Sequence, residues 1–121
     1  MSAPNAQSYC EDFENFDEFS WFLEDKPSHG THMYLYIKQE TQKVIDERKA
    51  AGMSNSDLKN LINIQCCNRI RRNMDDRDFW MRDLTKSGRW NRELHDAIYH
   101  HYYVLESAIF QAFNELMPQL L

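Results

Sequence analysis

The scarcity of helix-breaking residues is the feature that most constrains how this chain of 121 residues can fold. Glycine occurs only at positions 30, 52 and 88, and proline only at 4, 27 and 118. Between these breakers, apolar side chains recur every three to four residues, which is the spacing of one face of an α-helix. Runs of alternating apolar and polar residues, which would indicate strands, are not apparent. The sequence therefore predicts an all-α, single-domain bundle of four to five helices with a long C-terminal helix.

The first predicted helix covers residues 9–25 and follows a flexible tail of residues 1–8. Ser8 and Glu11 have the spacing of a capping box, in which each side chain satisfies backbone N–H groups at the helix start. Aromatic side chains recur at helical spacing and predict a stripe that faces the core, made of Phe13, Phe16, Phe19 and Phe22 with Leu23. Trp21 falls off this stripe, and Trp21 or Tyr9 is expected to protrude.

The other helices are predicted from the remaining breakers and caps. After a loop at residues 25–30, a second helix covers about residues 32–51 and ends at Gly52. Either Ser54 with Asp57, or Ser56 alone, is expected to cap a third helix, and a short fourth is expected near residues 75–86. The last helix carries the longest apolar stripe and is stopped by Pro118. Its stripe consists of Leu94, Ile98, His101, Leu105, Ala108, Ile109, Ala112, Phe113 and Leu116.

Charge is distributed unevenly along the chain, whose net charge is −5. Residues 1–25 contain seven carboxylates and neither lysine nor arginine, whereas all 14 basic residues lie in residues 26–121. Evenly spaced carboxylates can imitate a nucleic-acid backbone and attract a basic protein surface, while a protruding aromatic residue supplies an anchor. The predicted partner-binding residues are Glu11, Asp12, Glu14, Asp17, Glu18, Trp21, Glu24 and Asp25. The alternative interpretation is a solvated acidic face that keeps the protein soluble.

A basic stretch at residues 56–72 gives a second hypothesis, because it is similar to a helix-turn-helix. Asn63 and Ile64 would occupy the turn, and the residues after them would form a recognition helix in the major groove of DNA. The candidate nucleic-acid-binding residues are Gln65, Arg69, Arg71 and Arg72. One continuous amphipathic helix explains the same residues equally well, and the acidity of the whole chain argues against tight DNA binding.

A third hypothesis concerns Arg89 and His95, which are separated by five residues near the start of the last predicted helix. This spacing resembles the Arg–His motif of HEPN-type ribonucleases, in which a dimer brings two such motifs together. The resemblance implies that His95 acts in acid–base catalysis on a ribose hydroxyl and that Arg89 stabilises the phosphorane charge. It covers only these two residues, and Trp90 stands where the family usually has a polar residue.

The histidines and cysteines were weighed as metal ligands, and no metal or cofactor is predicted. Asp96 and His100 are four residues apart and would share a helical face, but di-iron bundles require Glu-x-x-His pairs, which this chain lacks. Cys66 and Cys67 are adjacent, so a helix would point them about 100° apart. No coherent catalytic set is found either, and the chain is predicted not to be an enzyme.

The chain has three cysteines, of which two are adjacent. An odd number with an adjacent pair does not indicate a disulfide framework and favours a reducing compartment. The N-terminus has neither the basic nor the apolar region of a signal peptide, and no stretch is apolar enough for a membrane span. These features predict a cytoplasmic, non-enzymatic interaction protein that regulates or inhibits a partner with a basic surface. Compact acidic helical proteins of this kind are frequent in phages and mobile elements. The identity of the partner and the oligomeric state are left open.

Overall fold

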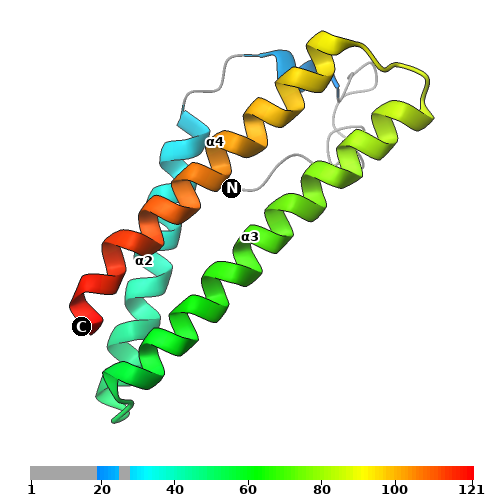
Figure 1. Cartoon of the computed structure of the whole chain (residues 1–121). Coiled ribbons are helices and arrows are strands. Elements are labelled where there is room, and N and C mark those ends of the chain that lie inside the picture. The colour runs from blue at the N-terminus through cyan, green and yellow to red at the C-terminus, as the bar shows by residue number, and fades with distance from the viewer. Residues whose placement is uncertain (1–18, 25–27) are drawn as a thin grey trace.

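Three long α-helices, flanked by two short 3₁₀ helices, form the computed structural model of the chain, which describes residues 19–24 and 28–121 (Figure 1). The elements in chain order are η1 (Ser20–Leu23), α2 (Ser28–Ala50), α3 (Asn55–Lys86), α4 (Arg92–Leu116) and η2 (Met117–Leu120). The predicted all-α class and the long C-terminal helix are confirmed. The prediction of four to five helices is wrong, because three α-helices pack together.

Helix α4 is the central element of this arrangement. It packs extensively against both α2 and α3, whereas α2 and α3 make few contacts with each other. Figure 1 shows that α2 and α3 meet at the end where they are connected and diverge toward their other ends. The space between α2 and α3 is therefore closed mainly by α4, along one side.

The connection between α2 and α3 forms where the sequence predicts it. Gly52 has φ +91°, a left-handed conformation that a residue without a Cβ adopts readily. The amide of Met53 donates to the Arg48 carbonyl and the amide of Gly52 to the Lys49 carbonyl, which is the Schellman pattern. The Asp57 amide then donates to Ser54 Oγ over 3.2 Å, so of the two predicted caps Ser54, and not Ser56, begins the helix.

Helix α3 runs without a break from Asn55 to Lys86, which corrects two predictions. The turn predicted at residues 63–64 is absent, so residues 56–72 form one continuous helix and not a helix-turn-helix. The separate helix predicted near residues 75–86 is the second half of the same element. The physical reason is that no glycine or proline occurs between Gly52 and Gly88, and a run of charged residues does not by itself end a helix.

Helix α2 begins at Ser28, so the loop predicted at residues 25–30 is wrong for its last three positions. Gly30 lies inside the helix and acts as a packing residue. A Cβ placed on Gly30 would come within 2.9 Å of Val104 Cγ1 on α4, closer than ordinary van der Waals contact. Glycine at this position therefore lets the start of α2 approach α4.

The segment before α2 differs from the predicted helix at residues 9–25. Residues 20–23 form a single 3₁₀ turn, and Glu24 is already extended, with ψ 144°. Phe19 and Phe22 are buried as predicted, but Trp21 is also buried, at 7% exposure, whereas Leu23 is exposed. A 3₁₀ turn has about three residues per turn, so the α-helical spacing misassigned these two side chains. Residues 1–18, which include the predicted flexible tail, and Asp25 lie outside the described residues.

The core is built around α4, whose predicted stripe is confirmed at every position except His101. Tyr102 takes the buried place that was assigned to His101, which is only half-buried. Asn91 caps α4 by accepting a hydrogen bond from the Leu94 amide over 2.8 Å. Within the described part of the chain, no helix combines the length and the apolar character that crossing a membrane requires.

Candidate functional site

An apolar surface lies along the outer side of the α3–α4 pair, away from α2. We call it the outer α3–α4 surface, and it consists of Cys66, Cys67, Ile70, Met74, Tyr99, Tyr103 and Phe110. Tyr103 is the most exposed of these large side chains, at 66%, and it lies one helical turn from Tyr99. A groove of about 360 Å³ runs between Met74 and Phe110.

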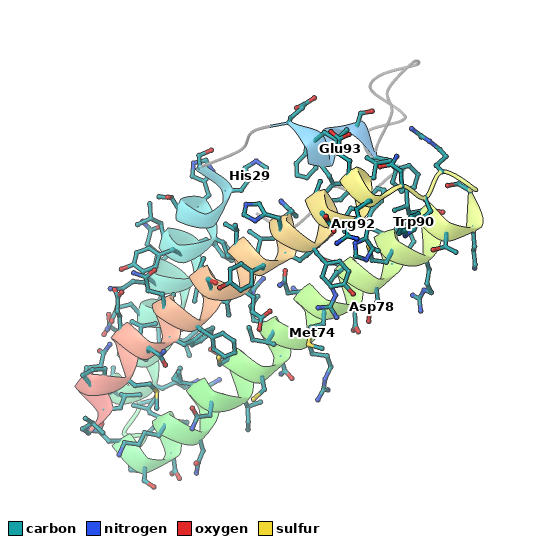
Figure 2. All side chains as sticks on the ribbon, turned by 45° about the horizontal axis from the view of Figure 1, so that its top comes forward. His29, Met74, Asp78, Trp90, Arg92 and Glu93 are labelled. Carbon is teal, nitrogen blue, oxygen red and sulfur yellow. The ribbon has the colours of Figure 1, made fainter. Side chains whose placement is uncertain are left out.

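Charged side chains border this apolar surface. The Arg77 guanidinium lies over the Tyr99 ring, 5.3 Å from its centroid, and pairs with the Asp78 carboxylate at 3.2 Å. Figure 2 shows Met74 and Asp78 projecting from α3 beside α4. Arg71 also lines the groove. The surface therefore has an aromatic and aliphatic centre with a rim of mixed charge.

A second groove lies between α2 and α3, and we call it the α2–α3 groove. Its volume is about 280 Å³, and its polar lining includes Tyr36, Glu40, Gln65, Asn68, Arg69 and Arg72. The Arg69 guanidinium lies over the Tyr36 ring, 5.6 Å from its centroid. Among the described residues, neither Arg69 nor Arg72 has a carboxylate oxygen within 4 Å.

The structure thus brings together three of the four candidate nucleic-acid-binding residues, Gln65, Arg69 and Arg72, in the α2–α3 groove. The fourth, Arg71, lies on the other side of α3 and lines the outer α3–α4 surface. A helix turns about 100° per residue, so consecutive arginines cannot share one face.

Asp76 continues this groove toward the C-terminal end of α3, beside Asn73 and Arg72. Burial raises the pKa of the Asp76 carboxyl, although the nearby Arg72 charge partly opposes the shift. Asn73 Nδ2 donates to the backbone carbonyl of Tyr102 over 3.1 Å, and the buried Tyr102 hydroxyl has no hydrogen-bond partner among the described residues. Burial and the charge of Asp76 raise the pKa of Tyr102.

Asp76→Asn is expected to stabilise the protein at neutral pH by up to about 1 kcal/mol, since the carboxylate is only partly buried. A carboxyl group whose pKa is higher in the folded state than in the unfolded state lowers the free energy of unfolding when it is ionised. This destabilisation is present above the folded-state pKa, and it disappears as the pH falls through that value toward the unfolded value of 3.8. Urea unfolding across this pH range measures the effect. Asp75→Asn is the comparison: Asp75 is exposed, and its charge is the smallest of the causes that shift the pKa of Asp76, so this variant should stabilise the protein less. A gain that persists at low pH would contradict the electrostatic explanation.

A third cluster holds η1 against α2 and α4. Measured between ring centroids, Trp21 lies 5.1 Å from His101 and 5.3 Å from His29, and the two histidine rings are 5.8 Å apart. Figure 2 shows His29 at the start of α2, beside η1. These contacts explain why Trp21, predicted to be a protruding anchor, is instead part of the folded interior.

The other predicted partner-binding residues are mostly outside the described part of the chain. Glu24 is exposed, as a partner-binding carboxylate must be. The remaining carboxylates lie outside the described residues, and their assignment stays a prediction: Glu11, Asp12, Glu14, Asp17, Glu18 and Asp25.

Arg89 and His95 lie in different surroundings. The Arg89 guanidinium lies over the Phe19 ring, 5.0 Å from its centroid, whereas the His95 ring lies between Trp90 and Tyr99. His95 Nδ1 is 3.0 Å from the Asp96 carboxylate, and this hydrogen bond is the main cause that lowers the pKa of Asp96. In residues 19–24 and 28–121, no three His, Cys, Asp or Glu side chains gather in a way that could hold a metal ion.

Comparisons of the chain with family models, with curated protein sequences and with solved structures gave no match.

Proposed function

We propose that the chain is a non-enzymatic interaction protein, a small regulator or inhibitor that binds a partner protein with a basic surface. The observation that carries this proposal is the outer α3–α4 surface. Exposed tyrosine, phenylalanine and methionine side chains with a charged rim are the residue types that dominate binding energy in protein interfaces. Exposed apolar side chains that gather on one surface mark interaction sites more often than apolar side chains that are scattered singly.

The charge of the chain supports a basic partner. The net charge is −5, and the seven carboxylates of residues 1–25 have no basic residue among them. Opposite charge on the partner would speed association and orient it, while the outer α3–α4 surface supplies the apolar contact. Cys66 and Cys67 are free thiols, which is consistent with action in the cytoplasm. A phage or mobile-element protein that blocks a basic nucleic-acid-binding protein fits this description.

Replacing Tyr103 and Phe110 together with alanine is expected to weaken partner binding at least about tenfold, or about 1.4 kcal/mol. Both side chains are exposed, so the free energy of unfolding should change by less than about 1 kcal/mol. The partner is first isolated from source cells with the full chain, and its affinity for each variant is then measured by titration calorimetry.

Leu35→Ala is the matched control, because Leu35 is a similarly exposed apolar residue on α2. This variant should bind the partner with the affinity of the wild-type chain. Equal affinity of the Tyr103 and Phe110 double variant would show that the outer α3–α4 surface is not the binding surface.

A further inference from the structure

We propose that the α2–α3 groove is the docking site of the chain's own acidic aromatic segment, residues 9–18. The groove combines an apolar floor, which includes Ile37 and Phe113, with two arginines on its α3 side. Because α2 and α3 make few contacts with each other, the groove stays accessible on the side away from α4.

The electrostatics of the groove favour carboxylates. Arg69 and Arg72 have no carboxylate oxygen within 4 Å among the described residues. Guanidinium groups bind carboxylates through strong bidentate hydrogen bonds. Glu40 is the groove's carboxylate on α2, and it already pairs with Lys43 at 3.2 Å. Asp76, further along, is compensated in part by Arg72.

Residues 9–18 match this groove in chemistry. They contain five carboxylates and no basic residue, together with Tyr9, Phe13 and Phe16. The carboxylates would pair with the two arginines, and the aromatic rings would cover the apolar floor. A nucleic acid is disfavoured as the occupant, because the chain as a whole is acidic.

The segment is also attached close to the groove. The described chain begins at Phe19, whose ring packs against Trp80 of α3 at 5.9 Å. Trp80 and Arg72 are eight residues apart on one helix, or about 12 Å along its axis. Ten residues reach about 15 Å as a helix and about 33 Å when extended. Tethering gives a local concentration of order millimolar, which favours the chain's own segment over a second copy.

A nitroxide at Cys10 tests the proposal in the full-length chain, with Cys66→Ala and Cys67→Ser removing the other thiols. Paramagnetic broadening of amide signals then reports which residues lie near Cys10. We expect strong loss of intensity at Tyr36 and Asn68 of the groove, with intensity retained at Tyr103 on the outer α3–α4 surface. Broadening centred elsewhere, or none, would overturn the proposal.

Charge reversal supplies the second arm of the test. Arg69→Glu combined with Arg72→Glu should abolish the broadening in the groove, whereas Arg71→Glu, on the other side of the same helix, should leave it unchanged. An equal effect of the two changes would overturn the proposal. Adding Glu14→Arg and Asp17→Arg to the double reversal should restore the broadening.

A mixed sample distinguishes the chain's own segment from that of another copy. Nitroxide on unlabelled chains should not broaden signals of isotope-labelled chains that carry no nitroxide, and broadening there would overturn docking within one chain. These measurements do not use the partner, so their failure would leave the proposed function standing.

Discussion

Replacing Trp80 with alanine is expected to cost about 3–5 kcal/mol of the free energy of unfolding. The side chain is 1% exposed and is among the largest fully buried ones in the described chain. The centroid of its ring lies 5.9 Å from that of Phe19 and 5.3 Å from that of Phe22, so Trp80 packs η1 and the residue before it against α3. Truncation removes these contacts and leaves a large cavity that helices on either side can close only in part.

Phe79→Ala is the control for this measurement, because Phe79 is the adjacent aromatic residue and is 48% exposed. Its truncation should cost less than about 1 kcal/mol. Urea unfolding monitored by circular dichroism gives both values. Equal losses for the two variants would contradict the packing described around Trp80.

Much of the fold follows from periodicity and from the few breakers in the sequence. The predicted stripe of α4 extends over six turns, and its stop before Pro118 is a local signal that packing does not override. Gly52 and Ser54 act in the same way at the α2–α3 connection. Such elements are predictable because their capping hydrogen bonds form between near neighbours in the chain.

The errors arose where tertiary packing decides the structure. The sequence predicts Gly30 to be a helix breaker, but Gly30 lies inside α2, where the close approach of Val104 on α4 leaves no room for a Cβ. The number of helices is overestimated because the sequence pattern places a boundary in the middle of α3, before a separate helix near residues 75–86. In the structure, Asn73 within that region is buried and donates to the Tyr102 carbonyl.

The outer α3–α4 surface was not predicted, although the sequence contains a signal for it. Tyr99, Tyr103 and Phe110 recur at helical spacing on a face of α4 that is separate from its core stripe. A second apolar stripe on one helix indicates a second contact. Sequence periodicity could not reveal that Ile70 and Met74 of α3 lie beside this stripe, because that depends on how the two helices pair.

Trp21→Ala is expected to lower the free energy of unfolding by about 3 kcal/mol, because the ring is buried against His29 and His101. Glu24→Lys, three residues away, should change stability by less than about 1 kcal/mol, since Glu24 is exposed. Both residues belong to the predicted partner-binding set. Chemical unfolding of the two variants shows which of them is needed for folding.

The same pair of variants separates folding from recognition by the proposed partner. Reversing the charge of Glu24 should slow association with a basic surface and reduce its dependence on salt, because electrostatic steering acts mainly on the association rate. Trp21→Ala, measured under conditions where the variant remains folded, should leave that rate unchanged, because a buried ring offers the partner no contact. If Trp21→Ala instead abolished binding and left stability intact, Trp21 would be an exposed anchor and its burial against α2 and α4 would be contradicted.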